Sequence, residues 1–101
     1  MERRNKQGNY FLEAIVDFRN IETSQMIQSN CLEIKFFNNG NKDCFINGVK
    51  LDQNEMLEIR QQPGFIDKTQ YQVVFRGEQG NPDLDIIRTL PKNQSKIDVD
   101  E

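Results

Sequence analysis

Turn-forming residues recur every eight to twelve residues along this chain, which leaves room only for short elements between them. Asn, Gly, Asp and Pro gather at residues 38–43, 47–48, 52–55, 63–64 and 78–83, and runs of alternating apolar side chains separate them. Alanine, which helix-rich domains use heavily, occurs only once. Such spacing is typical of an antiparallel sandwich or small barrel. We therefore predict an all-β protein, a small antiparallel β-sandwich, immunoglobulin-like or jelly-roll-like, with six to eight short strands.

The stretch "CFINGVKL" (44–51) predicts a β-hairpin in particular detail. Asn47 and Gly48 both accept a positive φ at low cost, so they suit the two-residue type I′ turn. Because residues opposite each other on paired strands share a face, that turn puts four apolar side chains together. These are Cys44, Ile46, Val49 and Leu51. We predict that this face packs into the core and that Cys44 is a packing residue rather than a catalytic thiol.

Residues 31–37 ("CLEIKFF") alternate apolar and charged side chains, as a half-buried strand does. We expect this strand to pair with 43–46 through a turn in which Asn39 and Gly40 take left-handed conformations. Cys31 would then lie roughly 20 Å along the strands from Cys44, too far for a disulfide. Both cysteines are therefore predicted to be reduced and unbonded.

Residues 10–20 ("YFLEAIVDFRN") fit two patterns. Their apolar side chains alternate as in a strand, but a second set fits the stripe of a helix. The strands expected later in the chain favour a strand here as well.

The size and charge of the chain suggest one domain with two charged ends. Its 101 residues match a single domain. We divide them into an N-terminal arm (1–9), a β-sandwich domain (10–91) and an acidic C-terminal tail (92–101). The arm carries a small basic cluster, and three of the last four residues of the tail are acidic. Two interpretations stay open: the ends are simply solvated, or they dock on neighbouring copies.

The composition argues against several classes of function. The net charge of -3 gives no basic face for nucleic acid, and the chain is too polar for a membrane span. It has no histidine, and its two cysteines do not form a CxxC pair, so no zinc site or activated thiol is expected. Its glycines are scattered singly, and its carboxylates cluster in turns. We therefore predict no catalysis, no metal and no cofactor.

Phe65, on the loop "QQPGFIDKT" (61–69), is the residue that most invites a functional interpretation. An apolar loop tip can fold back to cap a sandwich. It can instead stay exposed and anchor an interface, as aromatic residues on loops tend to do.

The stretch "LEIKFFNNGNKDCFINGVKLDQNEMLEI" (32–59) resembles small β-sandwich domains in structural proteins of tailed bacteriophages, notably crAss-like phages. The resemblance implies a virion component made in the host cytoplasm, such as an auxiliary (decoration) capsid protein or a small head–tail part. Its partners would be the major capsid protein and other copies of itself. The competing interpretation is a ligand- or carbohydrate-binding module of a bacterial surface protein. The expected interface residues are Arg3, Arg4, Lys6, Tyr10, Phe65, Ile97 and Val99.

Overall fold

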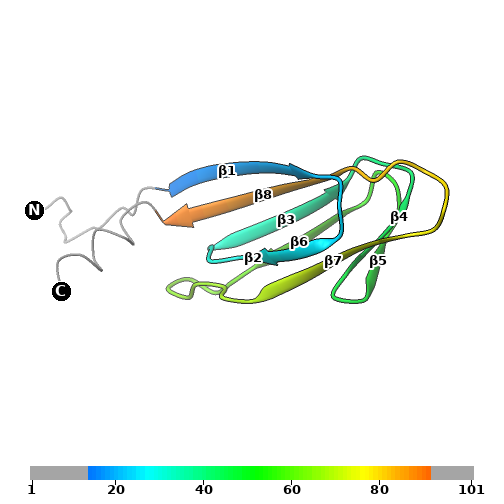
Figure 1. The fold of residues 1–101 in the computed structure, drawn as a ribbon. Helices are drawn as coiled ribbons and strands as arrows, with labels where there is room; N and C mark the ends of the chain where they lie inside the picture. Colours follow the sequence, from blue (N-terminus) through cyan, green and yellow to red (C-terminus); the bar gives the residue numbers. More distant parts are fainter. Residues whose placement is uncertain (1–13, 92–101) are drawn as a thin grey trace, which may run out of the picture.

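The computed structural model describes residues 14–91, which form eight β-strands and, within that range, no helix (Figure 1). The strands are β1 (Ala14–Ile21), β2 (Gln25–Gln28), β3 (Glu33–Asn38), β4 (Asp43–Ile46), β5 (Val49–Leu51), β6 (Met56–Arg60), β7 (Gln70–Arg76) and β8 (Leu84–Pro91). They form two four-stranded antiparallel sheets. The prediction of a small all-β sandwich is confirmed.

The order of the strands distinguishes between the two architectures considered from the sequence. Sheet A has the order β1-β8-β3-β6, and sheet B has the order β2-β7-β4-β5. Consecutive strands therefore change sheets at every connection except the β4–β5 hairpin. This arrangement is an eight-stranded jelly roll, in which the first strand pairs with the last.

The core lies between the two sheets and is built from the inward-facing residues of their central strands. Ile34 and Phe36 of β3 and Val73 of β7 are 0 % exposed. The ring of Phe36 contacts the ring of Tyr71 edge-on across the core, with centroids 5.4 Å apart. Each large apolar side chain buried in this way contributes about 1.5–3 kcal/mol to the free energy of unfolding.

The hairpin predicted at residues 44–51 is present. Asn47 and Gly48 have φ values of 48° and 84°. Ile46 lies opposite Val49, and Cys44 lies opposite Leu51. Three of the four predicted core residues are buried, but Val49 is 54 % exposed. Val49 begins a three-residue strand at the edge of sheet B, so it has a neighbouring strand on one side only.

The predicted pairing of residues 31–37 with 43–46 is wrong. β3 pairs with β6 and β8 in sheet A, whereas β4 pairs with β5 and β7 in sheet B. The error arose because a short turn suggests a hairpin, although the same length of chain can cross to the facing sheet. The prediction for the cysteines nevertheless holds, because Cys31 and Cys44 are both free and buried.

The reason for a glycine at position 40 also differs from the one predicted. Neither Gly40 nor Asn39 has a positive φ. Gly40 is needed because the backbone of residues 81–83 passes very close to it: a Cβ atom there would lie 2.2 Å from the carbonyl oxygen of Asn81. Close approach of two segments, rather than a left-handed turn, therefore requires glycine at this position.

The ambiguous N-terminal segment is a strand wherever it is described. β1 begins at Ala14, and residues 10–13 lie outside the described part of the chain. Ile21 points into the core, so the alternation of the strand puts Ala14, Val16 and Phe18 on the outer face of sheet A. The apolar alternation seen in the sequence therefore marks an exposed surface.

Candidate interaction surface

The largest exposed apolar side chains of the described residues include three from β1, the edge strand of sheet A. Ile15 is 48 % exposed, Val16 is 52 % exposed and Phe18 is 71 % exposed. Phe18 lies directly opposite the half-buried Ile87 of β8. Val16, Phe18 and Ile87 share the outer face of sheet A, whereas Ile15 faces the inner side of the strand, and we call these three outer-face residues the β1 patch. Apolar groups gathered on an edge strand, rather than scattered singly, indicate a contact surface.

An ion pair fastens β1 to the rest of the sandwich. The guanidinium of Arg88 lies 2.8 Å from Asp17, and its Nη1 donates hydrogen bonds to the carbonyl oxygens of Gln28 (3.2 Å) and Ser29 (2.8 Å). The side chains of Arg88 and Asp17 are only 18 % and 31 % exposed. Arg88 thus joins β1 to the connection that leaves β2, and it holds the patch in a fixed position.

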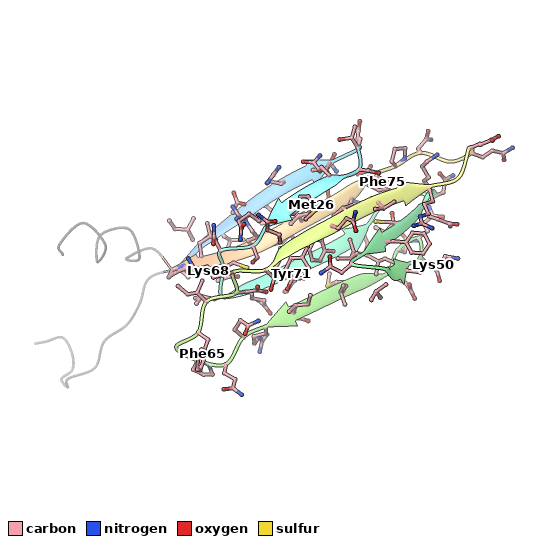
Figure 2. All side chains as sticks on the ribbon, turned by 60° about the horizontal axis from the view of Figure 1, so that its bottom comes forward. Met26, Lys50, Phe65, Lys68, Tyr71 and Phe75 are labelled. Atoms are coloured by element: carbon pink, nitrogen blue, oxygen red, sulfur yellow. The ribbon has the colours of Figure 1, made fainter. Side chains whose placement is uncertain are left out.

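Phe65 lies at the tip of the loop that connects β6 to β7, beyond the ends of the sheets (Figure 2). Its side chain is 59 % exposed, so it does not fold back to cap the sandwich. It borders a groove of about 610 Å³ that residues 60–65 line together with Leu32, Glu33 and Thr89. We call this the Phe65 groove. Because Thr89 also lies opposite Val16, the groove adjoins the β1 patch.

The base of the Phe65 loop is held by a cluster of hydrogen bonds around the buried Asp67. Asp67 and Cys31 exchange backbone hydrogen bonds of 2.7 and 3.1 Å. The hydroxyl of Tyr71 donates to Asp67 Oδ2 at 2.6 Å, and the amide of Thr69 donates to Oδ1 at 2.8 Å. Ser29 Oγ also lies 3.0 Å from Oδ1. The exposed aromatic tip therefore stands on an ordered base.

The protonation states of this cluster suit a structural role. Burial alone would raise the pKa of Asp67, but hydrogen bonds from Tyr71, Thr69 and Ser29 hold that pKa below its ordinary value. Burial and the bond to Asp67 raise the pKa of Tyr71 to about 12. Burial, then the charge of Asp67, raises the pKa of Cys31 to about 11. A neutral, fully buried thiol is a poor nucleophile.

Within residues 14–91, no group of three or more His, Cys, Asp or Glu residues gathers to hold a metal ion. No helix in that range is long and apolar enough to cross a membrane.

The structure places only one of the interface residues predicted from the sequence. Phe65 is at the groove, whereas the others lie outside the described residues: Arg3, Arg4, Lys6, Tyr10, Ile97 and Val99. Ala14 lies opposite Pro91, so both continuations of the chain start at one end of the sandwich. That end carries Thr89 and the Phe65 groove.

Sequence reasoning missed the β1 patch. The alternation of Val16 and Phe18 was visible, but an apolar alternation has the same appearance whether its face is covered or open. No signal in the sequence placed this strand at an edge.

Comparisons of the chain with protein-family models, with curated proteins and with solved structures find no match. The function is therefore inferred from the geometry and chemistry of the described residues.

Proposed function

We propose that this chain is a non-catalytic structural protein that binds a larger protein assembly. The setting we propose is a phage virion, with the chain as an auxiliary capsid protein on the shell formed by the major capsid protein. The exposed position of Phe65 on its anchored loop is the observation that carries the binding role, and the resemblance of residues 32–59 to phage structural proteins suggests the setting.

The energetics of interfaces support a binding role for Phe65. A large aromatic side chain in water gains free energy when a partner covers it, and such residues dominate many interfaces. Because its loop is already ordered by the Asp67 cluster, binding costs little additional conformational entropy. The Phe65 groove beside it offers a concave surface for one partner segment.

The location of the groove supports contact with a large partner. The arm and the tail both continue from the end of the sandwich that carries the groove. An arm with basic charge and a tail with acidic charge can therefore reach the same neighbours as Phe65. Jelly rolls occur in viral capsid and lectin domains, so the fold is compatible with a virion protein without deciding the function.

The test is incorporation of the chain into purified particles of the phage whose genome encodes it. We expect mass spectrometry to find the chain in many copies per particle, and electron microscopy to place these copies symmetrically on the shell. Deletion of residues 1–8 should abolish incorporation and leave the sandwich folded. Phe65→Ala should lower occupancy roughly tenfold or more.

Val49→Ala is a matched control, because Val49 is 54 % exposed but belongs to the hairpin of sheet B. This variant should incorporate normally. The proposal is wrong if purified particles lack the chain, or if both the deletion variant and Phe65→Ala incorporate as the wild type does.

The Phe65 groove also favours a second candidate, a carbohydrate-binding module. It combines an exposed aromatic ring with the polar side chains of Arg60, Gln61 and Gln62, and its volume of about 610 Å³ is in the range of small-ligand sites. In this case a glycan array should give binding that Phe65→Ala abolishes, and deletion of residues 1–8 should leave that binding unchanged. Absence of glycan binding by the wild-type chain would exclude this candidate.

A further inference from the structure

The β1 edge has the chemistry of a pairing surface for a second copy of this chain. Among residues 14–91, β8 is the only strand that pairs with β1, so the other side of β1 is open. This edge runs for eight residues, and proline is absent from Ala14–Ile21. Edge strands of soluble proteins are normally short, kinked or charged, because an open edge is a template for another strand.

The hydrogen bonds of β8 show which backbone groups of β1 face that open side. The carbonyl oxygens of Asp83 and Thr89 accept hydrogen bonds from residues on the β3 side. In an antiparallel sheet the direction alternates, so the backbone groups of Arg88 face β1 and pair with Asp17. The N–H and C=O groups of Val16, Phe18 and Asn20 therefore point outward. These three residues also carry side chains of the outer face.

We propose that β1 pairs antiparallel with β1 of a second copy, with Phe18 opposite Phe18 on the two-fold axis. The two A sheets then form one continuous eight-stranded sheet. Phe18 exchanges hydrogen bonds with its counterpart, and Val16 exchanges them with Asn20 of the second copy.

The charges of Asp17 and Arg19 favour this register over the two adjacent registers. A two-fold axis perpendicular to the sheet puts the outer faces of the two copies on the same side of the joined sheet. The register can therefore shift only in steps that keep outer-face residues opposite outer-face residues. With Phe18 opposite Phe18, Asp17 lies opposite Arg19 of the second copy, and opposite charges attract. A shift in one direction puts Asp17 opposite Asp17, and a shift in the other puts Arg19 opposite Arg19. Both of these alternatives are disfavoured by like charges.

The same register completes the apolar surface. Phe18 is 71 % exposed in the single copy, and Ile87 lies directly opposite it on the inner side. In the pair, an Ile87–Phe18–Phe18–Ile87 row crosses the junction, and aromatic pairs directly opposite each other stabilise antiparallel sheets. One strand edge buries less than a standard interface, so we expect a dissociation constant of roughly 1–100 µM. This inference does not depend on the proposed virion function.

Cysteine crosslinking of the full chain tests both the dimer and its register. Residues opposite each other on hydrogen-bonded strands have Cα atoms about 5.5 Å apart, within disulfide reach. We expect Phe18→Cys to form a disulfide dimer under mild oxidation. Val16→Cys alone should not, because its copies lie roughly 14 Å apart along the strands. A mixture of Val16→Cys and Asn20→Cys should crosslink as a heterodimer.

The controls separate specific pairing from random collision. The wild-type cysteines are buried, so the unmodified chain should give no crosslink. Phe65→Cys, with a thiol on an exposed loop (59 % against 71 % for Phe18), sets the background rate. Phe18→Asp should weaken dimerisation at least roughly tenfold in sedimentation equilibrium and keep the circular dichroism of the wild type. A chain that stays monomeric at several hundred micromolar, or a Val16→Cys variant that crosslinks as fast as Phe18→Cys, overturns the proposal.

Discussion

Sheet A ends in two very different edges, β1 on one side and β6 on the other. On both, the residues whose backbone faces solvent also point their side chains to the outer face. On β6 these are Met56, which is 50 % exposed, and the charged Glu58 and Arg60; Arg60 lies 2.9 Å from Glu33 and 3.3 Å from Glu58. On β1 the corresponding positions carry Ala14, Val16, Phe18 and Asn20, none of them charged.

The difference shows which edge is protected against pairing. Charged side chains keep water at the five-residue β6 edge, and a partner strand there would have to remove that water. On the eight-residue β1 edge a partner strand would cover apolar groups and satisfy open backbone groups together. The β1 and β6 edges belong to the same sheet and flank the same core, but they are therefore expected to behave differently in solution.

The largest effect should come from a buried charge on the strand that supports β1. Ile86 of β8 is 0 % exposed, and Ile86→Asp buries an unpaired carboxylate, so the chain should not fold at neutral pH. Phe18→Asp makes a similar change on the exposed face and should leave the chain folded. Circular dichroism and thermal unfolding of the two variants would compare them. A folded Ile86→Asp variant would mean that the core has been assigned wrongly.

A smaller loss of stability is expected when the ion pair between Arg88 and Asp17, which holds β1, is removed. Arg88→Met leaves Asp17 and the carbonyl groups of Gln28 and Ser29 without their donor, and should reduce the free energy of unfolding by about 2–3 kcal/mol. Arg60→Met removes the ion pairs of a guanidinium that is 71 % exposed, and should lower the denaturation midpoint much less than Arg88→Met does. Urea titrations measure both. Equal losses of unfolding free energy in the two variants would show that Arg88 holds β1 no more firmly than Arg60 holds β6.

Much of the pH dependence of stability should come from buried groups near the Arg88–Asp17 ion pair, and Cys44, whose pKa burial raises to about 11, adds to it at high pH. Tyr71 and Cys31 have pKa values raised to about 12 and about 11, from ordinary values of 10.0 and 9.0. Their folded forms bind protons more tightly, so stability is full below about pH 9 and falls as pH rises toward 12. Asp67 has a lowered pKa, so its contribution is present above its ordinary value of 3.8 and is lost at lower pH.

Denaturant unfolding between pH 2 and 12 checks these signs. Tyr71→Phe removes one ionising group and one hydrogen-bond donor to Asp67. It should therefore reduce the loss of stability both at low pH and at high pH. Val49→Ala, on the edge strand of sheet B, removes no ionising group and no hydrogen-bond donor, and should keep the wild-type profile. A stability that increases between pH 9 and 12 would contradict the assignment of buried neutral groups.

The smallest expected change in stability is that of Phe65→Ala. The side chain is 59 % exposed, so its removal should alter the free energy of unfolding by less than about 0.5 kcal/mol. Any loss of partner binding by this variant can therefore be attributed to the contact itself. A loss of several kcal/mol would show that Phe65 packs on the sandwich.

Local features of the fold could be predicted from the sequence, and non-local ones could not. The Asn47-Gly48 hairpin and its register follow from two residues whose backbone preferences are strong. The pairing of β3 with β8 depends on residues about fifty positions apart, and no turn specifies it. Gly40 illustrates the same limit, because the segment that requires a glycine there is distant in sequence.

The candidate surface was predictable to a similar extent. Phe65 could be selected because an aromatic residue next to Pro63-Gly64 stands out on a polar loop. Whether it was exposed depended on how Asp67 and Tyr71 anchor that loop, which the sequence does not reveal. The β1 patch escaped prediction for a related reason: exposure at an edge is a property of the sheet order.

Amide hydrogen exchange, resolved by residue and measured at several protein concentrations, tests the unequal edges most directly. The amides of Val16, Phe18 and Asn20 face the open side of β1, and those of Met56, Glu58 and Arg60 face the open side of β6. We expect exchange at all six to be fast in dilute solution. As concentration rises into the hundred-micromolar range, the three β1 amides should slow and the three β6 amides should stay fast. If the two sets respond alike, or if the β1 amides stay fast at every concentration, the β1 edge is not a pairing surface.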